Sequence, residues 1–267
     1  GRNGDFLITD VPPGDYTVQA VSRRGRGNRE PVFANERLSV NGQDMTDLVL
    51  RLRRGAVLNG RVTMGGTGLT RLDELPRLSI ETTSVAPQPM GQGDGIDGDV
   101  GPDGRFSLRG VGGGARLIRV DRLPDHLRLE AVHLGGRDVT DTPLSFNGEV
   151  DGVTVILTDQ LTELTGQVRD GRGRPLTGFT VIAFPADESL WQPQSRHVRA
   201  SRPDQNGQYQ LRGLPAGDYL LSVLDVVEQG EWFDPRLLTE LRDDAARVNL
   251  RAGQPRTLDL TLGDAQP

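Results

Sequence analysis

Apolar and polar residues alternate in short runs along this chain, and one pattern of runs occurs three times. The copies are "NGDFLITDVPPGDYTVQA" (3–20), "DGRFSLRGVGGGARLIRV" (103–120) and "NGQYQLRGLPAGDYLLSV" (206–223). Each contains an Asn-Gly or Asp-Gly pair, an alternating run, a glycine-rich turn and a second alternating run. Alternation with a period of two is typical of strands with one buried face. Each copy therefore predicts two β-strands joined by a tight turn.

The glycines in these copies predict the turn geometry. Asn-Gly and Asp-Gly pairs favour type I′ hairpin turns, in which both central residues have positive φ. The second turn ends on Gly14, Gly114 or Gly217, and we expect a backbone conformation there that alanine tolerates poorly.

Two further sets of runs indicate where each unit opens and closes. "LNGRV" (58–62) matches "LTGQV" (164–168), and each is expected to open a unit. Three runs are expected to close units: "LVLRL" (48–52), "VTVIL" (153–157) and "LDLTL" (258–262). The 18-residue copies begin about 100 residues apart, which is longer than a solenoid repeat of about 20–50 residues. The predicted domains are half of a first β-sandwich at 1–53, a second at 54–159 and a third at 160–267.

The strand and turn spacing predicts the fold class. About seven short strands with frequent turn signals are typical of an antiparallel sandwich, so we predict an all-β chain of tandem seven-stranded antiparallel β-sandwiches. One short helix is expected at 234–245, with Asp234 as N-cap and Pro235 in the first helical position. Its apolar face, which includes Leu237 and Leu241, is expected to cover an end of the third sandwich.

The first unit lacks opening strands of its own. An apolar face such as that of Phe6, Ile8 and Leu52 would stay uncovered, and soluble proteins avoid large apolar patches. Residues upstream in a longer protein could cover it, another chain could donate strands, or the unit could be partly disordered. The sequence leaves these three possibilities open.

Charge and composition exclude several classes of function. A net charge of −6 and a pI near 5.2 argue against nucleic-acid binding, which needs a basic surface. The chain contains no cysteine and no lysine, because all 31 of its Lys and Arg residues are arginine. Thiolate metal sites, cysteine nucleophiles, lysine Schiff bases and Lys–Asn isopeptide cross-links are therefore excluded. No apolar run approaches the 18 residues of a membrane-spanning helix.

The third copy and the run before it resemble a known family. "GQVRDGRGRPLTGFTVIAF" (166–184) followed by "RPDQNGQYQLRGLPAGDYLLSV" (202–223) resembles the carboxypeptidase regulatory-like domain. This resemblance implies a transthyretin-like (prealbumin-like) β-sandwich with a carbohydrate-binding-like fold. Such domains occur in tandem in bacterial envelope and secreted proteins and are not catalytic. The second copy departs from the family pattern, with Arg116 where the turn usually has tyrosine.

Candidate ligand residues are few. Asp94, Asp97, Asp99 and Asp103 could supply oxygen ligands to Ca²⁺, but the EF-hand spacing is missing and a solvated loop is the simpler interpretation. Trp191 and Trp232, with Arg196 nearby, could stack a sugar ring, or the two indoles could pack against the core and the helix. His126, His133 and His197 show no metal spacing and no triad pattern. We predict no catalytic residue and no cofactor.

These observations favour a non-catalytic scaffold or protein-interaction module outside the cytoplasm, whether secreted, periplasmic or on the cell surface. The alternative is a carbohydrate-binding module that uses the loop tryptophans of the third domain. The expected partners are other protein chains, or the upstream part of the same protein, and a glycan under the alternative.

Overall fold

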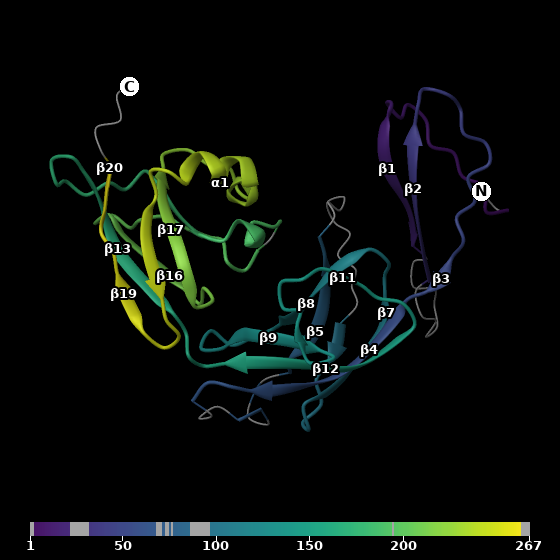
Figure 1. Ribbon diagram of the computed structural model, residues 1–267, viewed down its shortest axis with the longest axis horizontal. Coiled ribbons are helices and arrows are strands. Elements are labelled where there is room, and N and C mark those ends of the chain that lie inside the picture. Colours follow the sequence, from purple (N-terminus) through teal and green to yellow (C-terminus); the bar gives the residue numbers. More distant parts are fainter. Residues whose placement is uncertain are drawn as a thin grey trace.

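The computed structural model describes residues 3–21, 32–67, 71–72, 75, 77–85, 97–193 and 195–262. Its strands form five sheets in three groups, which we call the first, second and third units (residues 3–54, 56–158 and 163–262). Figure 1 shows the units following one another in chain order, with the first and third at opposite ends.

The first unit is one small sheet in the order β1-β2-β3. Its strands are β1 (Gly14–Val21), β2 (Val32–Val40) and β3 (Arg53–Arg54). Among its described residues only Ala34 is a buried apolar residue, so this unit has no core of its own.

The second unit packs two sheets around one core. The larger has the order β10-β9-β12-β4-β7 and the smaller β11-β8-β5-β6. The strands are β4 (Ala56–Met64), β5 (Ser79–Ser84), β6 (Asp97–Asp99), β7 (Arg105–Val111), β8 (Ala115–Asp121), β9 (Arg128–Leu134), β10 (Arg137–Asp138), β11 (Leu144–Ser145) and β12 (Glu149–Thr158). Alternate residues of β7 and β12 face inward, which confirms the period-two prediction for these strands.

The third unit also has two sheets, in the orders β16-β13-β19, with β20 also on β13, and β15-β14-β17-β18. The strands are β13 (Glu163–Asp170), β14 (Thr180–Pro185), β15 (Arg199–Ser201), β16 (Gln208–Arg212), β17 (Gly217–Leu224), β18 (Ala246–Leu250), β19 (Pro255–Thr257) and β20 (Leu260–Leu262). The helical elements are α1 (Pro235–Leu241) and the 3-10 turns η2 (Glu188–Leu190) and η3 (Glu231–Phe233).

The turn glycines occupy the same place in all three units. Gly14 pairs with Val40 in the first unit, and Gly217 pairs with Leu250 in the third. In the second unit Ala115, which follows Gly114, pairs with Ser145 in the same register. The glycines have φ of 159°, 94° and 156°. The strand after the glycine therefore forms in all three units, whereas the predicted strand before it forms only in the second and third units and residues 5–10 belong to no strand.

The all-β class is confirmed, but the sheets are mixed rather than purely antiparallel. The closing strand β12 runs parallel to the opening strand β4, and β19 and β20 run parallel to β13. In each of these units the opening and closing strands are neighbours in one sheet and run in the same direction, so they pair in parallel. Short extra strands also raise the strand number above the predicted seven.

The Asp-Gly and Asn-Gly turns differ from the prediction in type and place. Only the glycines, Gly104 and Gly207, have positive φ, whereas a type I′ turn would need it at Asp103 and Asn206 too. Gly207 N donates to Asp204 O at 2.9 Å, and Asp204 N to Gln208 O at 2.8 Å. This is a type I turn closed by a glycine bulge. The turns carry the chain from one sheet to the other, so they do not join hairpin partners.

The helix is shorter than predicted and covers a different surface of the third unit. Helix α1 ends at Leu241 instead of residue 245, and Asp234 caps it by accepting from Arg236 N. Leu238 is fully buried in a cluster with Ile182, Phe184 and Leu220. The helix therefore covers the outer face of the β14–β17 sheet rather than an end of the sandwich. This cover explains why β14 is buried along its whole length.

No helix in the described part of the chain is long and apolar enough to span a membrane.

Candidate functional site

A cluster of charged side chains joins the second unit to the third, and Asp141 is at its centre. The loop after β10 positions this residue. Thr140 N donates to Asp138 Oδ1 at 2.9 Å, and Val132 N donates to Thr140 Oγ1 at 2.8 Å. These bonds tie the loop to β9, so Asp141 is presented from a fixed backbone.

Asp141 receives two side chains from the third unit. Arg196 Nε donates to both carboxylate oxygens, at 3.0 and 2.9 Å, and Arg196 Nη2 lies 2.9 Å from Oδ2. His197 Nε2 lies 2.9 Å from the same Oδ2. Side chains of Asp141 and Arg196 are each 18% exposed and that of His197 10%, so solvent screens these contacts little.

Further bonds hold both sides of the junction. Arg119 Nη1 donates to Thr140 O at 2.8 Å, and Arg119 Nη2 lies 3.3 Å from Asp141 Oδ1. Arg196 Nη1 reaches across to the second unit and donates to Leu129 O at 2.9 Å. The contact therefore joins main chain and side chain of both units, which fixes its geometry better than a lone ion pair would.

The electrostatics of Asp141 follow from these neighbours. Burial by itself would raise the pKa of Asp141, but hydrogen bonds from His197 and Arg196 and the charge of Arg196 outweigh it. They hold the pKa of this carboxyl far below its usual range. Burial lowers the pKa of Arg119, although the Asp141 charge opposes that shift. The junction therefore contains an ionised carboxylate at neutral pH.

His197 links the junction to the core of the third unit. Its Nδ1 lies 3.2 Å from the Tyr219 hydroxyl, which also lies 2.9 Å from Pro215 O. Tyr219 is buried, and burial raises its pKa. The turn that ends at Gly217 thus supports the residue that contacts the second unit.

The first and second units contact each other through apolar residues and backbone. Phe33 of β2 packs against the core of the second unit, beside Gly112, where a Cβ would lie 3.4 Å from the Phe33 ring. Strand β3 pairs with β2 and leads directly into β4. At both junctions, side-chain or backbone contacts between the units therefore add to the covalent link.

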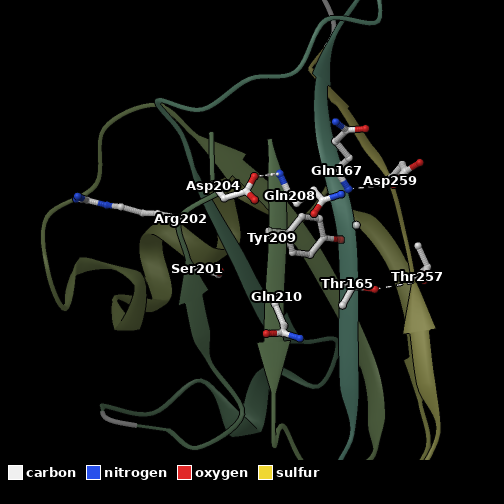
Figure 2. Close-up of a pocket in the computed structure, with 11 residues that line it drawn as sticks. Thr165, Gln167, Ser201, Arg202, Asp204, Gln208, Tyr209, Gln210, Thr257 and Asp259 are labelled. Atoms are coloured by element: carbon white, nitrogen blue, oxygen red, sulfur yellow. Dashed lines mark hydrogen bonds between the residues drawn. The ribbon is translucent and has the colours of Figure 1, made fainter. Parts of the chain in front are cut away.

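A polar hollow of about 620 Å³ lies beside the edge strand β16 of the third unit. Figure 2 shows Gln167, Gln208 and Asp204 around it. Its polar groups bond to one another: Gln208 N donates to Asp204 Oδ1 and Gln167 N to Asp259 Oδ1, both at 2.9 Å. Both carboxylates accept hydrogen bonds from backbone N–H groups. The hollow therefore presents no pair of free carboxylates for acid–base chemistry.

The predicted tryptophans are used by the core. Trp191 is 7% exposed, donates from Nε1 to Pro185 O at 2.8 Å and meets Phe184 edge-to-face at a centroid distance of 5.8 Å. Trp232 is partly buried in the same cluster, which includes Leu237 and Leu241. The core interpretation accounts for both rings, and a sugar-stacking role has no support from Trp191.

The predicted acidic cluster lies partly outside the described residues. Asp94 and the side chain of Asp97 are outside them. Asp99 is exposed on β6, while Asp103 accepts from Arg105 N at 3.1 Å and stabilises its turn. Within the residues that the structure describes, no three His, Asp or Glu side chains are grouped as metal ligands.

Sequence reasoning singled out Arg196 as a ligand residue but did not identify Asp141, its partner. The two are 55 residues apart and occur in different units. No sequence motif links Asp141 to Arg196, so only the three-dimensional structure shows that they are in contact.

One comparison concerns the third unit. Residues 163–263 match the family profile of the carboxypeptidase regulatory-like domain. The match covers the part of the chain whose sequence carries the resemblance.

Solved structures similar to the whole chain are distant. A Streptococcal ancillary pilin is 14% identical, with 96% of this chain and 78% of that chain covered and a TM-score of 0.30. The Bacillus anthracis TIE protein is 11% identical at a TM-score of 0.29, with 96% of this chain covered; this chain spans 44% of that protein. A minor pilin of Streptococcus agalactiae is 11% identical, with coverages of 78% and 95% and a TM-score of 0.29. No curated protein matches the sequence.

Proposed function

We propose that this chain is a non-catalytic scaffold that works outside the cytoplasm, on the cell surface, in the periplasm or after secretion. The observation that supports it best is the Asp141 junction, in which a carboxylate of one sandwich is held by Arg196 and His197 of the next. A chain of sandwiches fixed in this way keeps the parts attached to it at a set distance and angle. The domain boundaries that go with this proposal are 1–53, 54–159 and 160–267.

The scaffold has a place for a partner at its first unit. Strand β1 pairs only with β2 among the described strands, whereas β8 and β17 each have a neighbour on both sides. The first unit also exposes large apolar side chains. We propose that either another protein chain or upstream residues of the same protein complete this half-unit.

The alternative, a carbohydrate-binding module, is weaker because Trp191 belongs to the core. The polar hollow beside β16 offers amide and hydroxyl groups but no open aromatic ring, since Tyr209 is 2% exposed. Such rings are a usual platform for a sugar.

Small-angle X-ray scattering of the full chain tests the scaffold. We expect one fixed shape between pH 5 and 8, and a more flexible one for Arg196→Ala, which removes the bridge to Leu129 O and Asp141. Arg172→Ala, at an exposed turn, is the matched control and should leave the scattering unchanged. A flexible wild-type chain would refute the proposal.

A further inference from the structure

Among the residues that the structure describes, the first unit has no strand at the position that occupies the centre of the corresponding sheet in the other two units. In the second unit, β4 lies between β7, to which it is antiparallel, and β12, to which it is parallel. In the third unit, β13 lies in the same way between β16 and the pair β19 and β20. In both complete units, a strand at this position therefore links the strands on its two sides, which we call the flanks.

The two flanks are present in the first unit but do not form strands. Residues 5–10 match β7 and β16 in sequence, and residues 48–52 match the end of β12 and the run 258–262 that contains β20. Both segments are described, and neither belongs to a strand. The flank residues Phe6, Ile8 and Leu52 are 48%, 57% and 55% exposed, whereas Phe106 and Leu108, which match the first two, are 5% and 0% exposed.

The complete units show what kind of strand fits between such flanks. Both central strands read Leu-x-Gly-x-Val, at 58–62 and 164–168. Gly60 pairs with Phe106, and a Cβ there would lie 2.6 Å from the Phe106 ring and 2.2 Å from Val153 O. Gly166 pairs with Tyr209, and its Cβ would lie 2.8 Å from that ring and 1.8 Å from Leu258 O.

The glycine is thus required because an aromatic ring of one flank and a carbonyl of the other close over it. Phe6 stands in the first unit where Phe106 and Tyr209 stand in the others. The first unit would therefore also select glycine opposite its aromatic ring. The leucine and valine two residues to either side are fully or almost fully buried in both complete units.

We propose that the first unit binds one polypeptide strand of the Leu-x-Gly-x-Val type, supplied from outside these 267 residues, between segments 5–10 and 48–52. It would run antiparallel to the first segment and parallel to the second. The chain's own two strands of this type are buried in their own sheets, so a second folded copy has no such strand to give. Strand addition of this kind satisfies backbone groups along the whole segment. This inference rests on the proposed scaffold and names the partner of its open end.

Peptide binding to the full chain tests the inference. The probe is a synthetic peptide with the sequence of residues 162–170, and the control is the same peptide with its glycine replaced by valine. Isothermal titration calorimetry should show one site for the glycine peptide and at least about tenfold weaker binding for the valine peptide. Hydrogen exchange should slow in residues 5–10 and 48–52 on binding.

Two variants of the chain provide a matched pair. Ile8→Asp should weaken binding by about tenfold or more, because the corresponding Leu108 and Leu211 face the core. Leu7→Asp, at the neighbouring residue that is 86% exposed, should change the affinity less than about twofold. Both positions are exposed in the chain alone, so neither change should unfold it, and circular dichroism checks this.

Equal binding of both peptides, or of neither, would overturn the inference. So would a peptide-free chain that dimerises and protects the same amides, because a second copy would then fill the site. The peptide does not touch Asp141. A flexible junction in a chain that binds the peptide would refute the scaffold alone, and a rigid chain that ignores the peptide would refute this inference alone.

Discussion

At the scale of single residues, Asp141 decides how the second and third units are joined. Asp141→Asn keeps the shape of the side chain but removes the charge that Arg119 and Arg196 contact. Hydrogen bonds to charged groups are worth about 1.5–3 kcal/mol, and we expect a loss of that size in the free energy of unfolding at pH 7. Urea denaturation measures it. Asp125→Asn, at an exposed position, should cost almost nothing.

The pH dependence of that loss has a definite sign. The native pKa of Asp141 lies below its unfolded value of about 3.9. The stabilisation is therefore complete above about pH 4 and decreases as the pH falls through the native pKa. The difference between wild type and Asp141→Asn should therefore shrink as the pH falls below about 4. A difference that grew below that pH would contradict the assigned role.

Gly217 carries a second prediction at this scale. Its φ of 156° lies in a region that L-residues seldom adopt. Gly217→Ala should therefore lower the free energy of unfolding by about 1 kcal/mol or more. Gly178→Ala is the control, because that exposed glycine has no such φ and no heavy atom within 4 Å of an added Cβ. Equal effects of the two changes would show that φ does not limit the turn.

The sequence identified residues such as Gly217 and missed Asp141 for a physical reason. A turn depends on residues that are neighbours along the chain, so local chemistry predicts it. The junction depends on a carboxylate and a guanidinium from different units, and no local pattern reports their contact. Trp191 could be predicted in part. Tryptophan is rare in this chain, which suggested a defined role for each one, but only the structure shows the hydrogen bond from Trp191 to Pro185 O.

At the scale of elements, period-two alternation located most strands because most strands bury one face, although β14 is buried on both. It could not give the direction of pairing, so the parallel contact of β20 with β13 was missed. The helix was predicted too long because polar residues beyond Leu241 tolerate a helix without requiring one. The place of α1 over the β14–β17 sheet depends on Ile182, Phe184 and Leu220, which form a second apolar face.

The closing strand of the third unit gives a test of core packing. Leu260 is 6% exposed and belongs to the core between the two sheets, whereas its neighbour Thr261 is exposed. Leu260→Ala should destabilise the unit by about 2–5 kcal/mol, and Thr261→Ala by much less. Thermal and urea unfolding of the two variants compare these costs. A negligible effect at Leu260 would mean that β20 does not close the sandwich.

At the scale of the whole molecule, the account requires the second and third units to move as one body. The chain has no cysteine, so spin labels can be attached at chosen sites without removing native thiols. Ser107→Cys on β7 and Arg247→Cys on β18 place one label on an exposed position of each unit. Double electron–electron resonance then measures the distribution of distances between the two spin labels.

The same labelled pair should be measured in the wild-type background and with Arg196→Ala, which removes the Arg196 contacts to Asp141 and to Leu129 O. We predict one narrow distance distribution at pH 7 for the wild type and a clearly broader one for the variant. A broad distribution in the wild type, or an equally narrow one after Arg196→Ala, would contradict the claim that this junction makes the chain a scaffold.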